Sequence, residues 1–342
     1  MVTLTPLSRG EEDRAYREFF TPEYFTRHLG LPGQWQGGGV KPLGLRSPVE
    51  SSVLKHLLEG YSPDGTRPLA LDCAQPNRAP GWCLDLGVPH SLSVLWALAP
   101  EAARGSIELA HRAAAAVTLL DLERDLGGCR TGQHLSKELL PNGVFAWFSG
   151  RASRDQMPQL SVRAIIPNLG FLRDGTVTNF GSDRLLERRA GLATAYRALL
   201  GGQLQKHVGA FQEWANTDMR LVGVPPELCL KFCCDPNARH ELTDACGRSA
   251  TALQGQELFQ AWRRLGDKYG WGGRQAEALL GQMKRRQIWV RLRDQWDHTV
   301  QRARACSAQV AKSMKEVVLQ PTKSTGRSRP ARSRDKDMGH SH

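Results

Sequence analysis

The densest set of metal-ligating side chains in this sequence occupies a stretch of eighteen residues in its second half. The stretch contains Cys229, Cys233, Cys234, His240 and Cys246. Thiolates and imidazoles are the ligands that zinc prefers, and structural zinc sites pair cysteines about two to four residues apart. Cys229 and Cys233 also fall on an expected helix, where free cysteines pack as small apolar residues. Two interpretations stay open, a zinc site and a group of free thiols.

A basic segment interrupted by two tryptophans follows this cysteine cluster. Its cations are Lys284, Arg285, Arg286, Arg291, Arg293, Arg302 and Arg304. Cations that pair with phosphates beside rings that stack on bases are typical of single-stranded nucleic acid binding. Trp289 and Trp296 are seven residues apart, so on a helix they share one face, which could instead be buried with Ile288 and Leu292. The five basic residues from 284 to 293 are therefore candidate DNA-binding residues, and the tryptophans have two interpretations.

The charge balance favours a polyanionic partner. The chain has 342 residues and a net charge of +12. Residues 320–342 carry six basic and two acidic side chains and no apolar residue except Ala331 and Met338, which predicts a disordered tail. That tail is either a solubilising segment or a non-specific phosphate-binding arm. The remaining charge of +8 belongs to residues 1–319, so basicity is part of the fold and favours nucleic acid first.

Composition excludes several classes of protein. A hydrophobic fraction of 40% with nine Trp and ten Phe is enough for a packed core, so wholesale disorder is excluded. No apolar run approaches the roughly 18–20 residues of a membrane span, and the first residues lack the apolar segment of a secretory signal. Eight cysteines are too sparse for a disulfide scaffold. We therefore expect a cytoplasmic protein with reduced thiols and no membrane insertion.

Turn residues and apolar periodicity divide the chain into helices and strands. Helices are expected at 11–20, 49–59, 91–99, 101–126 and 182–208, and strands at 82–88, 143–148 and 160–166, the last two joined by a polar loop at 149–159. Beyond two prolines at 225 and 226, residues 227–234, 252–270 and 273–318 follow a helical period. The sequence predicts an α+β domain at 1–226, a helical region at 227–319 and a disordered basic tail at 320–342.

Short motifs spread over residues 16–275 carry a family resemblance. They are Trp35-Gln36-Gly37-Gly38-Gly39, Leu43-Gly44-Leu45, Pro63-Asp64-Gly65, Gly81-Trp82, the run from Pro89 to Leu98, Ala110-His111, Leu122-Glu123, Ser153-Arg154, Pro158-Gln159-Leu160, Asn168, Asp174-Gly175 and Gly223-Val224-Pro225-Pro226. No single motif is specific, but their order and rough spacing are. As a set they resemble the relaxase domain of conjugative plasmid transfer proteins, the MobF family of TrwC and TraI.

The resemblance implies a fold and a reaction. The fold is a central antiparallel sheet flanked by helices, the palm of HUH endonucleases, with helical fingers that close over DNA. In the family, a tyrosine attacks the scissile phosphate of one strand at a transfer origin, giving a 5′-phosphotyrosine and a free 3′-hydroxyl. Three histidines hold a divalent metal, Mg²⁺ or Mn²⁺, that polarises the phosphate, and an aspartate assists. By the same resemblance Arg154 is a candidate DNA-binding residue.

The metal site is where the sequence departs from the family pattern. The positions that match the three histidines are Gly150, Ser161 and Arg163. Glycine offers no ligand and arginine is a permanent cation, so we expect no metal here. A guanidinium can pair with a phosphate, which makes Arg163 a candidate DNA-binding residue that partly replaces the charge of the metal. The alternative is a structural strand residue that pairs with an Asp or Glu.

The acidic and basic helpers are altered as well. The segment Gly81-Trp82-Cys83-Leu84-Asp85-Leu86 places Cys83 where the family has its aspartate. Residues two apart on a strand face the same side, so Asp85 could act from a displaced position or be an unrelated polar residue. His90 replaces a family lysine, and it is either a base or a structural residue.

The family nucleophile has two candidate equivalents, Tyr24 and Tyr16. Tyr24 is the better match because its distance to Trp35 resembles that of the second tyrosine pair of the family. A phenol with a pKa of about 10 is a weak nucleophile without a metal or a base. The alternative is that either ring packs against the fold or against a DNA base.

Three hypotheses about function follow. The first is a relaxase-like protein that binds single-stranded or origin-type DNA with lost or weakened cleavage. The second is an active tyrosine relaxase that uses Tyr24 or Tyr16 in a rearranged site. The third is an accessory protein-interaction factor without nuclease activity, for which the tail would be the relevant surface. Because family relaxases usually carry a helicase, we expect a separate helicase or other transfer proteins as partners.

Overall fold

The computed structural model divides the chain into two units, residues 1–288 and 289–342. The structure describes residues 2–8, 32–70, 73, 78–127, 130–131, 134–140, 142–153, 155–179, 185, 187–210, 212–215, 218–234, 242, 255–288, 293, 295, 297 and 300–301. Everything below on packing concerns the first unit. The finer division at residue 226, which follows composition, stays a prediction.

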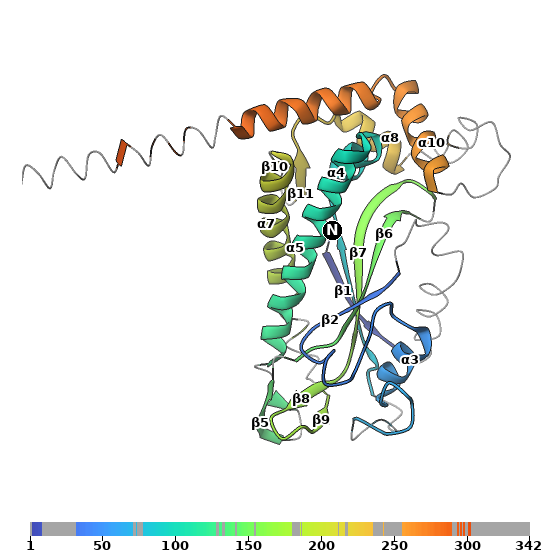
Figure 1. The fold of residues 1–342 in the computed structure, drawn as a ribbon, viewed down its shortest axis with the longest axis vertical. Coiled ribbons are helices and arrows are strands. Elements are labelled where there is room, and N and C mark those ends of the chain that lie inside the picture. The colour runs from blue at the N-terminus through green and yellow to red at the C-terminus, as the bar shows by residue number, and fades with distance from the viewer. Residues whose placement is uncertain are drawn as a thin grey trace, which may run out of the picture. The chain divides into compact units, whose positions relative to one another are not determined.

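A five-stranded antiparallel sheet is the centre of the fold (Figure 1). Its strands are β1 (Val2–Leu7), β2 (Gln34–Gln36), β3 (Gly81–Gly87), β6 (Phe145–Ala152) and β7 (Pro158–Pro167), in the order β1-β3-β7-β6-β2. β7 lies in the middle because it pairs along nearly its whole length with both β3 and β6. Its long apolar run, buried on alternate positions and then continuously, is typical of a central strand.

The loop expected at 149–159 is wrong in its extent. β6 continues to Ala152 and β7 begins at Pro158, with Ala152 opposite Pro158 after an irregularity in the ladder. The polar residues that suggested a loop belong to the ends of two strands, where a side chain can face solvent on an antiparallel sheet. The edge strands β1 and β2 were also missed. β2 has only three residues, whereas in β1 the alternation of Val2 and Leu4 with threonines was a strand signal that the sequence analysis did not use.

Six further strands form two smaller sheets. β4 (Arg130–Thr131), β5 (His134–Leu140), β8 (Gly170–Leu172) and β9 (Val177–Thr178) form one, and β10 (Gln212–Ala215) with β11 (Asp218–Leu221) forms a hairpin. None of these short strands was expected from the sequence. The hairpin is the element that carries the chain from the end of the long helix before it to the helical region after it.

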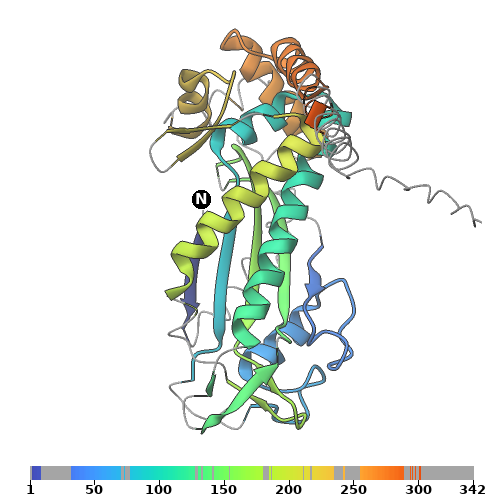
Figure 2. The same ribbon diagram turned by 90° about the vertical axis from the view of Figure 1, so that its left-hand side faces the viewer.

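Two long helices cover one face of the central sheet. α5 (Glu101–Gly127) and α7 (Arg189–Val208) lie side by side along it (Figure 2). Their apolar positions, among them Leu119 and Leu204, join Leu84 and Val162 of the sheet in one buried cluster. We call this the closed face. The helix periods predicted from the sequence for both segments are confirmed.

The shorter helices extend the same core. α4 (His90–Leu98), α8 (Pro226–Cys234) and α10 (Gly255–Lys268) pack together, with α4 in contact with both of the others. Trp96, Phe259 and Trp262 meet edge to face or tilted, with ring centroids 5.1–5.8 Å apart. The buried indole of Trp262 donates a hydrogen bond to the carbonyl of Gln156 at 2.8 Å. The helical region is thereby fixed to the loop between β6 and β7.

The helix over residues 273–288 packs against the end of α7. α7 ends at Gly209, which has a positive φ of 73°, and a side chain at that position would meet the carbonyl of Met283 at 2.7 Å. Gln287 donates its amide to the carbonyls of Gln205 and Lys206 in the last turn of α7, where carbonyls lack the N–H partners of the helix interior. A glycine is therefore required at the turn by both conformation and close approach.

The glycine-rich motif at residues 35–39 is held by one buried carboxylate. Glu123 of α5 accepts hydrogen bonds from the backbone N–H groups of Gly38 at 2.6 Å and Gly143 at 2.7 Å. Burial raises the pKa of Glu123, and the two N–H donors oppose that shift. Two motifs far apart in the sequence thus meet at one structural contact, which explains their residue types.

The α+β prediction of a central antiparallel sheet flanked by helices is confirmed. Within the part of the chain that the structure describes, there is no helix whose length and apolar character would let it cross a bilayer.

Candidate functional site

Among the residues that the structure describes, those on the second face of the sheet cover only half of it. α3 (Ser51–Glu59) packs Leu54 and Leu58 against Phe148 and Ile165, and Cys83 lies against the edge of this cluster. Beyond it, towards the start of β7 and the end of β3, the same face is hollowed. We call this half the open face, and the hollow above it the cleft.

The strand register places Gly150, Ser161 and Arg163, which the sequence resemblance matches to the family metal positions, side by side on the open face. Ser161 of β7 is paired with Gly150 of β6 on one side and Gly87 of β3 on the other. Arg163, two residues further along β7, is paired with Phe148 and with Asp85 of β3. Because residues two apart on a strand share a face, Gly150, Ser161, Arg163 and Asp85 together form the cleft floor. The two glycines that flank Ser161 leave the middle of this floor without long side chains.

Arg163 and Asp85 form an ion pair on that floor. The Nε–H of Arg163 donates to the Oδ1 of Asp85, and about a third of each side chain is exposed. This is the kind of acidic partner that the structural interpretation of Arg163 required. An exposed pair of this type contributes little to stability, so the pair mainly fixes where the guanidinium and the carboxylate lie.

The cleft has a volume of about 1070 Å³ and walls from four elements. His90 and Ser91 come from the first turn of α4. The hollow also reaches Val2 and Thr3 of the edge strand β1, where α7 of the closed face lines it, and its remaining walls are the end of β11 with its following turn, and α8. Two cations that the sequence did not single out, Arg197 of α7 and Arg220 of β11, line these walls. No motif marks them, because only the packing of α7 and the hairpin brings them to the cleft.

Hydroxyl groups of α4 hold the cleft walls together. The Oγ of Ser91 accepts from the N–H of Leu221 at 3.0 Å, and the Oγ of Ser93 accepts from the N–H of Leu160 at 3.2 Å. Both hydroxyls are buried. The serines of the motif from Pro89 to Leu98 thus attach α4 to β11 and β7, which positions His90 at the cleft edge.

A buried Tyr–His pair lies at the cleft wall. The Oη of Tyr196 on α7 is 2.9 Å from the Nδ1 of His111 on α5, and both side chains are about 1% exposed. Burial lowers the pKa of His111 to about 4, and a hydrogen bond with the backbone of Ser161 opposes this. Burial also raises the pKa of Tyr196 far above its usual value. His111 is therefore a neutral residue, and its contact with Tyr196 joins α5 to α7 beside the cleft.

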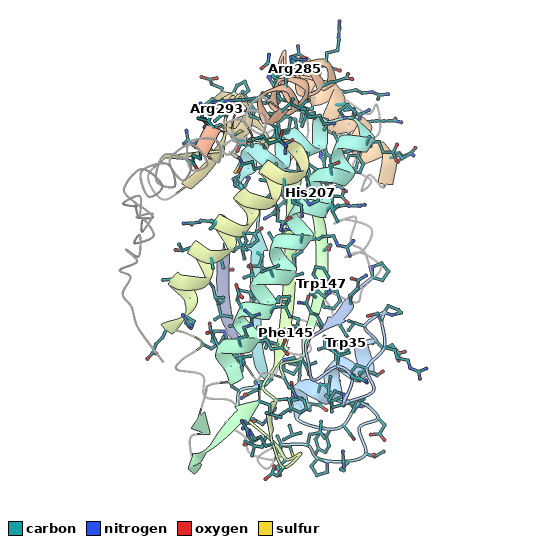
Figure 3. The ribbon with its side chains drawn as sticks, turned by 60° about the vertical axis from the view of Figure 1, so that its left-hand side comes forward. Trp35, Phe145, Trp147, His207, Arg285 and Arg293 are labelled. Carbon is teal, nitrogen blue, oxygen red and sulfur yellow. The ribbon has the colours of Figure 1, made fainter. Side chains whose placement is uncertain are left out.

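The other predicted site residues are distributed as follows. Tyr16, Tyr24, Arg154, Arg291, Trp289 and Trp296 lie outside the described residues. Lys284, Arg285 and Arg286 are exposed on the helix over residues 273–288, and Arg293 is exposed on a helical segment of the second unit. Figure 3 labels Arg285 and His207, which lie at neighbouring helix ends of the first unit. Ile288, which the burial interpretation of the tryptophans included, is 57% exposed.

The described side chains contain no cluster of three or more His, Cys, Asp or Glu with the geometry to hold a metal ion. Cys229 and Cys233 are not in disulfides. The side chain of Cys234, and His240 and Cys246, lie outside the described part, so the zinc interpretation of this stretch stays open.

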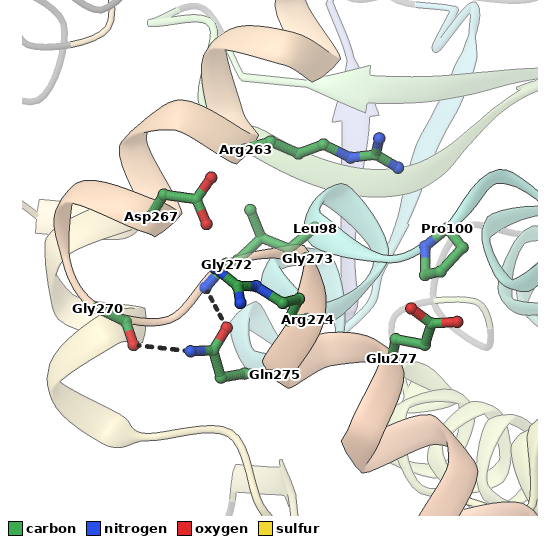
Figure 4. A pocket seen from close by; sticks show the side chains of 10 residues that line it. All are labelled: Leu98, Pro100, Arg263, Asp267, Gly270, Gly272, Gly273, Arg274, Gln275 and Glu277. Atoms are coloured by element: carbon green, nitrogen blue, oxygen red, sulfur yellow. Dashed lines mark hydrogen bonds between the residues drawn. The ribbon is translucent and has the colours of Figure 1, made fainter.

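A second, smaller hollow lies between α10 and the helix that follows it (Figure 4). Its volume is about 670 Å³. Its lining contains two arginines, Arg263 and Arg274, and two acidic residues, Asp267 and Glu277. Gln275 closes the turn by accepting from Gly272 and donating to Gly270. The mixed charges and the turn that closes on itself argue against a phosphate site, so the first cleft is the candidate site.

Comparisons with known proteins agree with this fold and extend over most of the chain. The TrwC relaxase family profile matches residues 8–235. The multifunctional conjugation protein TraI of Escherichia coli K12 is 33% identical over 144 residues, and a second Escherichia coli TraI is 32% identical over the same length. These matches cover 41% of this chain but 8% of TraI, so the chain spans a small part of the curated relatives that it matches.

Solved structures give the same result for the fold. The metal-bound structure of the conjugative relaxase TrwC in complex with oriT DNA superposes with a TM-score of 0.64 at 22% identity, over 79% of this chain and 99% of that chain. The structure of TrwC with a 27-mer DNA comprising the recognition hairpin and the cleavage site gives a TM-score of 0.60 at 22% identity. At this level of identity the likeness concerns the fold.

Proposed function

The chain belongs to the TrwC relaxase family, and from this premise we propose that it binds single-stranded, origin-type DNA in the cleft with lost or strongly weakened strand cleavage. The observation that carries the proposal is the set of side chains on the cleft floor. Gly150, Ser161 and Arg163 occupy neighbouring positions of β6 and β7, where the family resemblance places its metal ligands.

These residues do not fit a divalent metal. Gly150 has no donor atom, Ser161 offers one neutral hydroxyl, and Arg163 is a cation that repels another cation. The remaining carboxylate, Asp85, already accepts from Arg163. Hard divalent cations need several oxygen ligands, and transition metals prefer imidazole or thiolate. Metal assistance supplies several kcal/mol of transition-state stabilisation, so this cleft floor would support cleavage slowly if at all.

The cations of the cleft support binding of the DNA backbone. Arg163 lies on the floor and Arg197 and Arg220 on the walls, and guanidinium groups form paired hydrogen bonds with phosphate oxygens. Asp85 reduces the charge that Arg163 offers, so a phosphate on the floor would share this guanidinium with the carboxylate. The wall arginines would then contribute a comparable part of the affinity, although no motif marks them.

The positions of the described tyrosines limit which residue could be the nucleophile of an active relaxase. The chain has five, and Tyr61, Tyr196 and Tyr269 are described. Only Tyr196 among these three lines the cleft, but it is about 1% exposed and its burial raises the pKa of its hydroxyl. A phenol that is buried and hard to ionise cannot attack a phosphate. Activity would therefore depend on Tyr24 or Tyr16, with Asp85 as the candidate helper.

A combined binding and cleavage assay tests the proposal. The probe is a pool of end-labelled single strands, each with a hairpin followed by randomised residues, incubated with the protein and Mn²⁺ and resolved on native and denaturing gels. We expect binding whose log K falls steeply with log salt, and no covalent adduct. A protein-linked product that Tyr24→Phe or Tyr16→Phe removes would establish the active relaxase instead.

The same assay separates the third hypothesis. Absence of salt-dependent binding to every member of the pool would favour an accessory protein-interaction factor. A positive result would make a helicase or other transfer proteins the partners to test next, because a bound origin strand must still be unwound from its complement.

A further inference from the structure

The α8 wall of the cleft carries two thiols one helical turn apart. Cys229 and Cys233 both line the cleft, together with Leu230, whose side chain is 61% exposed. The wall is therefore apolar and sulfur-rich, whereas the floor opposite is polar and charged. The resemblance to the relaxase family assigns no role to thiols here.

Cys233 is paired with a histidine from a distant segment. Its Sγ lies 3.4 Å from the Nε2 of His90, the first residue of α4. Both side chains are exposed at the cleft. An imidazole in hydrogen-bond contact with a thiol can accept its proton and stabilise the thiolate, which is the reactive form of cysteine. The contact brings together residues 143 positions apart, so the pair exists only through the packing of α4 against α8.

The other described cysteines lack this combination. Cys229 is half-buried, and burial raises the pKa of its thiol while the charge of Arg220 opposes that rise. Cys83 is partly buried against the apolar cluster below the cleft, and Cys73 is also partly buried. Among the described thiols, Cys233 is the exposed one. The protein thus supplies matched controls for a claim about this site.

We propose that Cys233, with His90 as its base, is a modification site for low-molecular-weight disulfides of the glutathione class. His90 accepts the thiol proton, and the Cys233 thiolate attacks one sulfur of the disulfide. The S–S bond of the reagent breaks as a new S–S bond forms to Cys233. The second half leaves as a thiolate, which takes up the proton from His90. Cys233 is oxidised to a mixed disulfide and one equivalent of small thiol is the reduced product, so electrons and protons balance.

The consequence for the cleft rests on the proposed function. A glutathionyl group on Cys233 would occupy part of the cleft and bring two carboxylates close to Arg220 and Arg197. Both effects would weaken DNA binding. The glutathionyl group would exclude the strand from part of the cleft, and its carboxylates would repel the phosphates. Modification would therefore release DNA, and reduction of the mixed disulfide would restore binding.

The first experiment tests the site without DNA. The reduced full-length chain is incubated with oxidised glutathione, and intact mass and peptide mapping report the position and rate of the adduct. We expect Cys233 to react about tenfold faster than Cys229, Cys73 or Cys83. His90→Gln should remove most of that advantage, and Cys233→Ser should leave only the slow background. Equal rates at all cysteines, or an undiminished rate in His90→Gln, would overturn the proposal.

Two controls keep this result interpretable. Circular dichroism of both variants shows that they fold. Elemental analysis before the reaction tests for bound zinc, and a thiol that reacts only after a chelator is added would show that Cys233 is a metal ligand and would also overturn the proposal.

The second experiment measures DNA binding before and after modification. The wild-type chain should lose about tenfold or more in affinity for a single-stranded oligonucleotide, with recovery after dithiothreitol, whereas Cys233→Ser treated in the same way should be unchanged by the reagent. A specific adduct without loss of affinity would refute the regulatory consequence while the modification site stands. No DNA binding before treatment would refute the proposed function and leave the mass result unaffected.

Discussion

The two faces of the central sheet differ in what surrounds them. On the closed face, Leu84 and Val162 are fully buried beneath α5 and α7, and the helices bring Leu119 and Leu204 against them. On the open face, α3 is the described helix that packs on one half, and the floor of the cleft in the other half holds an ion pair, a serine and two glycines. The same three strands therefore carry a packed core on one side and a polar hollow on the other.

This difference shows which residues are tightly constrained. A buried leucine that loses its side chain leaves a cavity, so packing restricts what can replace it. A side chain on the floor of an open cleft touches water and few neighbours, so many residues are tolerated there for stability. The TrwC fold would therefore tolerate a change of the residues at the metal positions, as we propose for this chain. The closed face maintains the fold, and the open face determines the chemistry.

The largest effect expected from this comparison is the creation of a metal site on the open face. Replacing Gly150, Ser161 and Arg163 together by histidine puts three imidazoles on neighbouring positions of β6 and β7, which is a donor set for divalent transition metals. We expect calorimetry to show one-site binding of Mn²⁺ or Zn²⁺ with a dissociation constant of about 1 µM, or about 8 kcal/mol.

The matched control keeps Arg163 and changes only Gly150→His and Ser161→His. Its retained guanidinium should weaken binding at least tenfold, or about 1.4 kcal/mol. A folded triple variant that binds no metal would show that these three positions do not converge as the register indicates.

A core truncation on the closed face should have the next largest effect. Leu119 and Leu120 are neighbours on α5, but Leu119 is fully buried and Leu120 is 45% exposed. Leu119→Ala should lower the free energy of unfolding by about 2–5 kcal/mol, and Leu120→Ala by less than about 0.5 kcal/mol. Urea unfolding followed by circular dichroism measures both. On the open face, Ser161→Ala should also lower the free energy of unfolding by less than about 0.5 kcal/mol. A larger loss there would contradict the difference in packing between the two faces.

Acid should destabilise the protein through the buried His111. Its folded pKa of about 4 lies below the unfolded value of 6.5, so the unfolded chain binds more protons between these pH values. Stability therefore falls as pH drops below about 6.5, by about 2 kcal/mol from this site at pH 5.

Urea unfolding at pH 7.5 and pH 5 checks this contribution. His111→Gln should unfold more easily at pH 7.5 but lose the part of the acid sensitivity that comes from this residue. His207→Gln, on the partly exposed end of α7, keeps His111 and should retain it. An unchanged pH dependence in His111→Gln would contradict the assignment.

The smallest effects concern DNA affinity, and they have opposite signs within one ion pair. Arg163→Gln removes a cation and leaves Asp85 as a bare negative charge, so single-strand affinity should fall by about 1 kcal/mol, with the salt slope lower by about 1. Asp85→Asn frees the guanidinium and should raise affinity by a similar amount. Fluorescence anisotropy at several salt concentrations measures both.

Two further variants, Arg197→Gln and Arg124→Gln, test whether DNA affinity depends on the cleft or on overall charge. Arg197 lines the cleft, so its loss should weaken binding with the same salt signature. Arg124 lies on α5 with its side chain 79% exposed, within 3.5 Å of Asp121, and its loss should leave affinity unchanged. Equal losses in the two variants would mean that binding responds to overall charge and not to the cleft.

The sequence predicted much of the fold because long periodic segments report their own structure. The periods of α5 and α7 and the strands β3 and β7 follow from apolar spacing, since each element buries one side or both. The short strands β2, β10 and β11 were missed, because a few residues do not carry a period and their pairing depends on distant partners. The extent of β6 was also wrong, because the polar residues at its end resemble a loop.

The candidate site divides in the same way. Ordered motifs predicted that Gly150, Ser161 and Arg163 stand at the metal positions, since matching motifs can be recognised without coordinates, and the strand register brings the three residues together. Nothing in the sequence pointed to Arg197, Arg220 or the pair of Cys233 with His90. These residues meet only because α7, the β10–β11 hairpin, α4 and α8 pack around one hollow, and contacts between distant segments have no local pattern.

By itself, then, the sequence determined that the chain is a basic α+β protein of relaxase type, and it predicted that Gly150, Ser161 and Arg163 stand at the metal positions of the family. Composition and motif order are properties of the chain alone, and they need no knowledge of packing. Only the tertiary structure decided that Arg163 faces Asp85, that His111 is buried and neutral behind the cleft floor, and that one thiol of α8 lies against an imidazole of α4. Charge, burial and reactivity depend on neighbours, and the fold determines which residues are neighbours.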